Sequence, residues 1–188
     1  MELSETLVNV CKALDVHKIP YMIIGGQAVL YHGYPRLTED IDITLGLSIS
    51  DFQKLLNILG DINCSPLVKN PEDFIKTTWV LPVEQYGSKI KIDFTFSFSE
   101  YETEAISNAV SVSINSVNVN FCSLNDLIIH KIFAGRPRDI DDVKNIYLKN
   151  KDKINLDYIL KWLGEFDKSY SEVPKYSYTK LLKEIIND

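Results

Sequence analysis

The sequence predicts an α/β chain, in which a small mixed β-sheet flanked by helices is followed by an all-helical C-terminal lobe. Three observations support this fold class. Short apolar or alternating runs, typical of strands, recur up to residue 121, and stripes with helical spacing separate them. From Ser123 onward only the helical spacing continues. We therefore expect two domains, residues 1–122 and residues 123–188.

The individual elements follow from apolar spacing and from residues that start or stop helices. In chain order we expect a helix over residues 3–14, a strand over 21–24, a helix over 27–31, a strand over 39–45, a helix over 52–59, strands over 77–83 and 89–98, a helix over 100–108, and strands over 110–114 and 117–121. Ser50–Gln53 reads as a capping box for the helix that follows it. Four further helices begin near Ser123 and Pro137 or carry stripes over 156–163 and 178–185.

The composition is that of an ordinary globular chain. Of 188 residues, 45% are hydrophobic and 24% are charged, which excludes a disordered chain. Apolar runs such as Tyr21–Ile24 are too short to span a bilayer, and the acidic first residues do not resemble a signal peptide. Three scattered cysteines without a CxxC pair suggest small buried hydrophobes in a reducing compartment. We expect a cytoplasmic protein with no membrane partner.

The charge balance restricts the possible partners. The formal net charge is −6, whereas a protein that holds duplex nucleic acid through many phosphates is normally basic. We therefore expect no large duplex footprint, although a local basic edge would suffice to hold one RNA end. The three histidines, His17, His32 and His130, fit no metal-ligand spacing.

The strongest functional signal is the run Asp40–Ile43, in which two carboxylates alternate with two isoleucines. Because side chains alternate between the faces of a strand, Asp40 and Asp42 point one way while the isoleucines enter the core. Two carboxylates on one face repel each other, and they are tolerated in solvent or around a divalent cation. Taken alone, the pattern favours a solvated strand face.

A third carboxylate changes that interpretation. Residues 89–97 alternate again, with Lys89, Lys91 and Asp93 on the face opposite the apolar residues. If this strand neighbours the Asp40 strand, Asp93 joins Asp40 and Asp42 around one point. Such an oxygen-only ligand set is what Mg²⁺ prefers, and two ions about 3.5–4 Å apart are common in phosphoryl transfer.

Phosphate-binding groups are expected beside these carboxylates. Gly25 and Gly26 follow an apolar strand and precede a short helix, which leaves backbone N–H groups for a phosphate, although a tight turn needs the same residues. Arg36 and Thr38 lie just before Asp40 and offer cationic and hydroxyl donors. For Arg36 alone, a solvated loop charge is the alternative.

Together these residues resemble the nucleotidyltransferase superfamily of the DNA polymerase β type. More narrowly, residues 25–29, 36–43 and 91–94 are similar to the branch related to the AbiEii toxins, and residues 131–142 are similar to its helical-lobe motif. The likeness covers roughly residues 20–145. The chain departs from it at Gly26, where many members have serine, and it lacks the Ala-Arg-Gly of the minimal nucleotidyltransferase antitoxins.

The resemblance implies a nucleotidyltransferase that transfers a nucleoside monophosphate from a nucleoside triphosphate and releases pyrophosphate. It implies that the catalytic and Mg²⁺-binding residues are Asp40, Asp42 and Asp93, with two ions and with Mn²⁺ as a substitute. It implies that the nucleotide-binding residues are Gly25, Gly26, Arg36, Thr38 and Lys131. The acceptor is an RNA 3′ end, a protein or a small hydroxylated molecule; the toxin branch favours RNA or protein and implies a cognate antitoxin. The alternative is a non-catalytic protein that keeps the fold and acts through a partner.

Two further groups lie in the helical lobe. Leu124, Leu127 and Ile128 set an apolar stripe whose next position is Lys131. That lysine must reach past the helix end, pair with a buried anion, or contact the nucleotide phosphates, and we expect the phosphate contact. By resemblance, Arg138, Asp139 and Asp142 form an additional site, and the alternative is that the two acidic residues serve the helix N-terminus.

Overall fold

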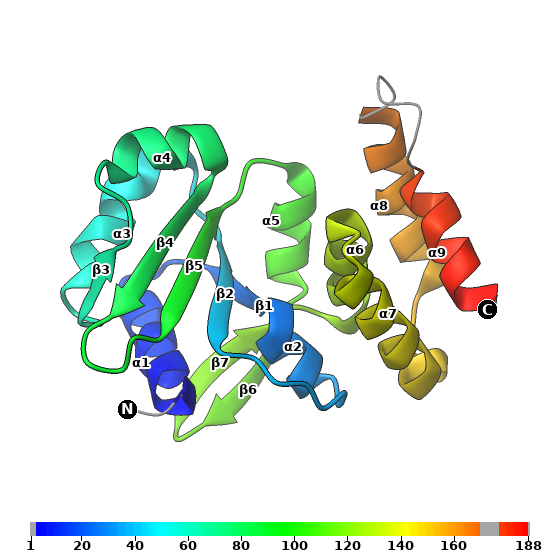
Figure 1. The fold of residues 1–188 in the computed structure, drawn as a ribbon, viewed down its shortest axis with the longest axis horizontal. Helices are drawn as coiled ribbons and strands as arrows, with labels where there is room; N and C mark the ends of the chain where they lie inside the picture. The colour runs from blue at the N-terminus through cyan, green and yellow to red at the C-terminus, as the bar shows by residue number, and fades with distance from the viewer. Residues whose placement is uncertain (1–2, 170–176, 188) are drawn as a thin grey trace. The chain divides into compact units, whose positions relative to one another are not determined.

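The computed structural model describes residues 3–169 and 177–187, which form two compact units (Figure 1). Unit 1 takes its residues from 1–28 and 37–122, and unit 2 takes its residues from 29–36 and 123–188. The helical unit thus includes one short segment, residues 29–36, that the expected division at residue 122 assigns to the α/β part.

The described residues of unit 1 contain a seven-stranded mixed sheet in the order β3-β4-β5-β2-β1-β7-β6. The strands are β1 Tyr21–Ile24, β2 Asp40–Leu45, β3 Cys64–Pro66, β4 Val80–Gln85, β5 Lys91–Phe96, β6 Val110–Ile114 and β7 Val117–Phe121. Strand β2 pairs in parallel with β5 and antiparallel with β1, and β1 pairs in parallel with β7. The expected mixed sheet is confirmed, and β2 and β5 are neighbours at its centre.

Helices flank this sheet. They are α1 Leu3–Val16, α2 Gly25–Tyr31, whose last residues belong to unit 2, α3 Phe52–Leu59, α4 Pro71–Thr78 and α5 Glu100–Ser107. The core between sheet and helices is built from the alternate apolar residues of the strands; Ile41, Ile43 and Phe94 are fully buried. Burial of this kind is the main force that holds the strands in register.

Two local expectations for unit 1 were wrong. Residues 77–78 end α4 and are not part of a strand, so β4 begins three residues later than expected. Ser50 lies in a 3-10 turn, Ile49–Asp51, and α3 has no side-chain cap. The capping box of this unit is instead at α5, where the Ser99 hydroxyl accepts from the Glu102 N–H and the Glu102 carboxylate accepts from the Ser99 N–H.

Unit 2 is helical, as expected, and contains α6 Leu124–Ala134, α7 Pro137–Asn150, α8 Leu156–Ser169 and α9 Tyr178–Asn187. Ser123 caps α6 by accepting from the Asp126 N–H, and Gly135 ends it in the left-handed region at a φ of 61°. Pro137 occupies the first turn of α7, where its missing N–H is not needed. A 3-10 turn, Lys151–Lys153, follows α7.

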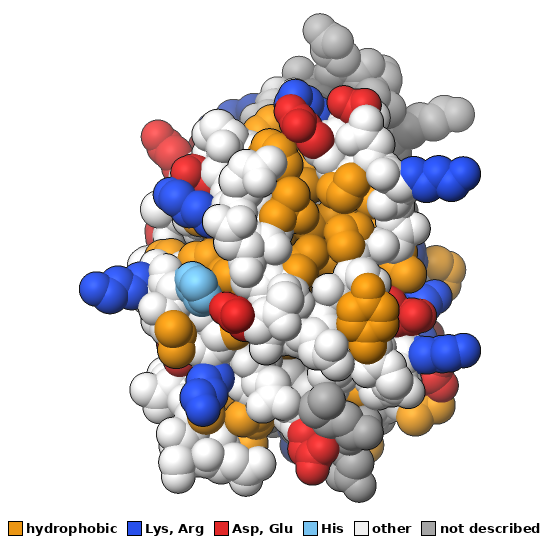
Figure 2. Space-filling model, turned by 90° about the vertical axis from the view of Figure 1, so that its left-hand side faces the viewer, with side chains coloured by type: hydrophobic (Ala, Val, Ile, Leu, Met, Phe, Trp, Pro, Cys, Tyr) orange, Lys and Arg blue, Asp and Glu red, His pale blue; other side chains and the backbone are white. Residues whose placement is uncertain are grey.

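Hydrophobic side chains gather in the middle of one face of unit 1, with charged side chains around them (Figure 2). The large exposed hydrophobic residues of this unit include Val16, Leu67, Phe74 and Tyr86.

Within the described residues, no helix is both long and apolar enough to cross a bilayer.

Candidate active site

Two neighbouring strands bring the three predicted carboxylates of unit 1 together. In the parallel register of β2 and β5, Asp42 lies opposite Asp93 and Asp40 lies opposite Lys91. Residues opposite each other in a sheet point to the same face, and neighbouring strands are about 4.8 Å apart. Ile41 and Ile43 are fully buried on the other face, as the alternation predicts. Asp42 and Asp93 are half-buried, and Asp40 is exposed.

The electrostatics of this cluster are unfavourable without a counter-charge. Partial burial raises the pKa of Asp93, and the negative charge of Asp40 raises it further, while Lys91 acts in the opposite direction. The Thr38 hydroxyl donates to Asp40 Oδ1 at 3.0 Å. Among the described residues, no three His, Cys, Asp or Glu side chains already surround a metal position. The register therefore supplies an acidic face, and bringing its carboxylates around one ion requires side-chain rotation.

The glycine pair lies directly against this acidic face. Gly25 has a φ of +62°, and a Cβ there would lie 1.9 Å from Asp42 Oδ2. A Cβ at Gly26 would lie 2.4 Å from the Thr38 Oγ1 atom. Real Cβ atoms do not approach so closely, so a side chain at either position would force Asp42 or Thr38 to move. The consequence is that backbone of the β1–α2 turn lies next to Asp42 and Thr38 with no side chain between them.

A network of ion pairs in unit 2 joins three cations to two buried carboxylates. Lys131 Nζ lies 2.8 Å from Asp139 Oδ1 and 2.8 Å from Asp142 Oδ2. Arg36 Nη1 lies 2.5 Å from the same Asp142 oxygen, and Arg136 Nε lies 2.6 Å from Asp139 Oδ2. Lys131, Asp139 and Asp142 are almost completely buried. We call these five residues the charge network.

In the charge network Lys131 pairs with two buried carboxylates, which is one of the three roles that the sequence left open for this lysine. Burial by itself raises the pKa of Asp139, but hydrogen bonds from Arg136 and Lys131 outweigh it, so the pKa is lowered overall. A direct contact of Lys131 with nucleotide phosphates stays a prediction. Asp139 and Asp142 share a face of α7, as their spacing indicates, whereas Arg138 is exposed.

Arg136 is the member of the network that sequence reasoning did not single out. A signal for it was present in the sequence, because Arg136 stands directly before the predicted start of the helix at Pro137 and three residues before Asp139.

The remaining reactive side chains belong to the interior. Cys11, Cys64 and Cys122 are buried thiols. Burial raises the pKa of Cys11 to about 12 and that of Cys64 to about 11, so neither forms a thiolate nucleophile at neutral pH. Desolvation likewise lowers the pKa of His130 to about 4, and the positive charge of Lys131 acts in the same direction, which keeps this ring neutral.

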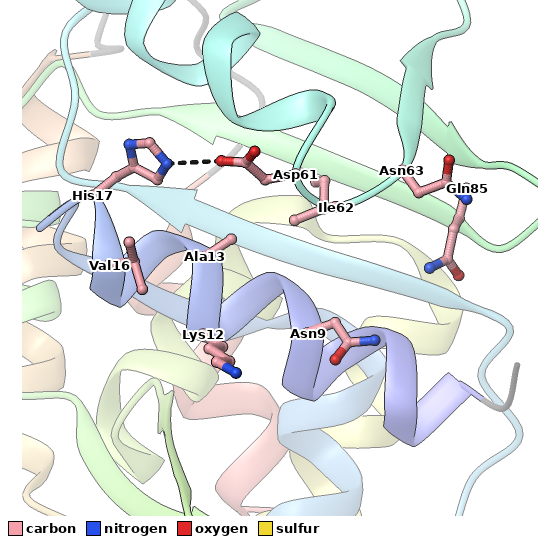
Figure 3. Close-up of a pocket in the computed structure, with 9 residues that line it drawn as sticks. All are labelled: Asn9, Lys12, Ala13, Val16, His17, Asp61, Ile62, Asn63 and Gln85. Carbon is pink, nitrogen blue, oxygen red and sulfur yellow. Dashed lines mark hydrogen bonds and ion pairs between the residues drawn. The ribbon is translucent and has the colours of Figure 1, made fainter.

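A separate pocket of about 450 Å³ lies between α1 and the β3 end of the sheet (Figure 3). His17 and Asp61 close one end of it, 2.9 Å apart, and amide side chains such as Asn63 and Gln85 line the other end. None of the sequence-predicted site residues lines this pocket.

Comparison with known structures finds solved proteins with a similar fold. The solution structure of the antibiotic-resistance factor ANT(2'')-Ia aligns with a TM-score of 0.62 at 14% identity, over 93% of this chain and 97% of that one. The lincomycin-bound lincosamide adenylyltransferase LnuA aligns at 0.53 and 16% identity, over 76% of this chain and 94% of that one. ANT(2'')-Ia in complex with adenylyl-2''-tobramycin aligns at 0.59 and 15% identity, over 89% and 98%. At these identities the likeness concerns the fold.

The family is shown by the sequence itself. Residues 1–187 match the family described as "Nucleotidyltransferase of unknown function (DUF6036)", and the chain belongs to it. No curated protein matches the chain. The expected superfamily is thereby confirmed, whereas the narrower likeness to the AbiEii branch stays a prediction.

Proposed function

We propose that the chain transfers a nucleoside monophosphate from a nucleoside triphosphate to a nucleophilic acceptor in a Mg²⁺-dependent reaction. The observation that carries the proposal is the pairing of Asp42 with Asp93 in the β2–β5 register, on the face that also holds Asp40. Membership in a nucleotidyltransferase family supplies the reaction class. The three carboxylates offer only oxygen ligands, which fits Mg²⁺, with Mn²⁺ as a substitute.

In this reaction the acceptor oxygen forms a bond to the α-phosphorus while the bond from that phosphorus to the pyrophosphate oxygen breaks. We assign metal binding to Asp40, Asp42 and Asp93, and to Asp93 also a part in taking the proton from the acceptor. Bound Mg²⁺ supplies neutralisation of the phosphate charges. The contribution of the protein is positioning and fixed charge, as is usual in phosphoryl transfer.

We assign phosphate binding to the β1–α2 turn and to Arg36. Gly25 and Gly26 let the turn approach Asp42 and Thr38 without a side chain in the way. The Nε of Arg36 is buried and has no hydrogen-bond partner among the described residues. The charge network holds three cations against two carboxylates. A buried guanidinium N–H without an acceptor, in a network with excess positive charge, favours binding of an anion.

The acceptor is an RNA 3′ end, a protein side chain or a small hydroxylated molecule. The AbiEii resemblance supports RNA or protein, and it also supports a toxin role with a cognate antitoxin protein in the cytoplasm. The neighbours bound to lincomycin or adenylyl-tobramycin support a small hydroxylated acceptor. The transfer assay below distinguishes these classes.

The test is incubation of the full chain with each α-³²P-labelled nucleoside triphosphate, Mg²⁺, and total RNA, lysate protein or a small-molecule extract. We expect one triphosphate to label one acceptor class, and we expect EDTA or Asp42→Asn to abolish the labelling. Asp15→Asn, an exposed carboxylate of α1 in the same unit, is the matched control and should keep full transfer. Metal-dependent triphosphate binding without any transfer would contradict the proposal and support the non-catalytic alternative.

A further inference from the structure

The two units carry very different charge. The residues of unit 1 include seven Lys and Arg against fifteen Asp and Glu, a formal charge of −8, whereas unit 2 has thirteen against eleven, a formal charge of +2. Burial increases the contrast, because Asp126, Asp139 and Asp142 are buried in unit 2, whereas among its described Lys and Arg side chains Lys131 alone is buried. A polyanion is therefore repelled by unit 1 and attracted by unit 2.

The positive charge of unit 2 is concentrated where α7 ends. Residues 144–153 contain four lysines and a single carboxylate. Lys149, Lys151 and Lys153 are exposed, and none of the three forms an ion pair with a carboxylate in the described part of the chain. Favourable interaction with the helix C-terminus accounts for a lysine in the last turn, but Lys153 lies beyond it.

Aromatic rings lie beside these lysines. Lys151 Nζ lies 5.5 Å from the centroid of the Tyr147 ring. Lys149 Nζ donates to the Gly33 carbonyl, and Asn150 Nδ2 donates to the His32 carbonyl at 3.5 Å. These bonds hold residues 32–33 against the end of α7. Tyr31, the residue before them, is 38% exposed and meets the His32 ring edge to face at a centroid distance of 4.8 Å.

We propose that this surface, formed by Tyr31, Tyr147, Lys149, Lys151 and Lys153, binds a single strand of nucleic acid. Lysines contact the phosphates, and the tyrosine rings stack on bases, the combination that single-strand binding proteins use. A duplex does not fit, because its bases are not open for stacking and a three-lysine footprint neutralises few phosphates. The binding does not require the reaction proposed above.

The test is fluorescence anisotropy of labelled twelve-nucleotide U₁₂ RNA, dT₁₂ DNA and a duplex of the same length with the full chain. The double variant Lys151→Gln, Lys153→Gln should bind single strands about tenfold or more weakly. For this variant, the slope of log affinity against log salt concentration should be shallower by about 1.4, since each single-strand phosphate contact contributes about 0.7 to that slope. Lys12→Gln, Lys18→Gln, two exposed lysines of unit 1, is the matched control and should bind as the wild type does.

Further variants and one control measurement distinguish the contribution of stacking from effects of transfer activity and from misfolding. Tyr31→Ala should weaken binding about tenfold, because one base then loses the ring on which it stacks. Asp42→Asn should bind like the wild type even if it transfers nothing, which distinguishes this proposal from the catalytic one. Circular dichroism melting shows whether each variant is folded.

Binding of U₁₂ or of dT₁₂ supports the assignment, and their ratio identifies the sugar. Undiminished binding by the double lysine variant, or equal affinity for duplex, would overturn it. Salt-sensitive association of the chain with itself and no oligonucleotide binding would also overturn it, and would assign the surface to an acidic protein face.

Discussion

At the scale of single residues, Gly25 is the position where the fold and the acidic face constrain each other most directly. Gly25→Ala adds a Cβ 1.9 Å from Asp42 Oδ2 and places alanine at a φ of +62°. We expect a loss of about 2 kcal/mol or more in unfolding free energy, together with loss of transfer, because Asp42 must move. Urea unfolding and the transfer assay measure the two effects.

Gly87→Ala provides the matched control for this substitution. Gly87 also has a positive φ, +86°, but nothing lies within 4 Å of its added Cβ. Strain alone should therefore destabilise this variant by about 1 kcal/mol and leave transfer intact. Equal losses of activity in both variants would show that the collision with Asp42 has no functional meaning.

The acidic face also makes a prediction about stability. Asp40→Asn removes the negative charge that adds to burial in raising the pKa of Asp93, so in EDTA the melting temperature should stay equal or rise while transfer is lost. Differential scanning calorimetry at neutral pH checks this. A collapsed fold would contradict the metal-binding assignment and indicate a structural role for Asp40.

At the scale of elements, the charge network joins α6, α7 and the Arg36 segment. Lys131→Met keeps much of the side-chain volume but leaves Asp139 and Asp142 buried without their shared cation. Removing one partner of a buried ion pair costs about 3–5 kcal/mol, so we expect a fall of that order in unfolding free energy. Adding Asp142→Asn to the same chain should recover part of it, because one uncompensated charge is then gone. No change on Lys131→Met would mean that the network contributes nothing to stability.

The same network predicts a pH dependence. Because the folded pKa of Asp139 is lowered, the folded state favours its charged form, and the stabilisation is fully present above the unfolded pKa of 3.8. It is lost as the pH falls through the lowered folded pKa. The wild type should therefore exceed Asp139→Asn in unfolding free energy at pH 6, and this difference should shrink on acidification below pH 3.8. A difference that is constant with pH would contradict the assignment.

How much the sequence could predict depends on the range of the interactions. The alternation in Asp40–Ile43 and around Asp93 was enough to predict strands β2 and β5 and the faces on which their carboxylates lie, because strand periodicity is a local property of the sequence. Strand β3 and helix α4 were missed, since three residues ending in Pro66 show no alternation and Glu72, Asp73 and Lys76 make α4 mostly polar.

Cap chemistry and long-range pairing limited the prediction elsewhere. Ser50 had the spacing of a capping box, but it lies inside the 3-10 turn Ile49–Asp51 that precedes α3. In that turn the Ser48 hydroxyl donates to Asp51 Oδ2 at 2.9 Å. The partners of Lys131 lie eight and eleven residues onward across the turn at Gly135, beyond any single helix period. Arg36 and Asp142 are 106 residues apart, so no local pattern could have paired them.

At the scale of the whole molecule, the two units are not successive stretches of chain. The segment 29–36 belongs with residues after 122, and it supplies Arg36 to Asp142 and the Gly33 carbonyl to Lys149. Charge is divided in the same discontinuous way, because thirteen of the twenty Lys and Arg belong to the shorter unit 2. Neither the division nor the asymmetry is visible in the overall net charge of −6.

This discontinuity has a consequence for how the polypeptide is made. Segment 29–36 leaves the ribosome long before α6 and α7 exist, and residues 37–122, the larger part of unit 1, are synthesised in between. The C-terminal helices can therefore pack against residues 29–36 only after residues 37–122 have been synthesised. A fragment starting at Ser123 would lack Arg36 and residues 32–33, so the C-terminal helices cannot be cut out as an autonomous module with their ion pairs intact.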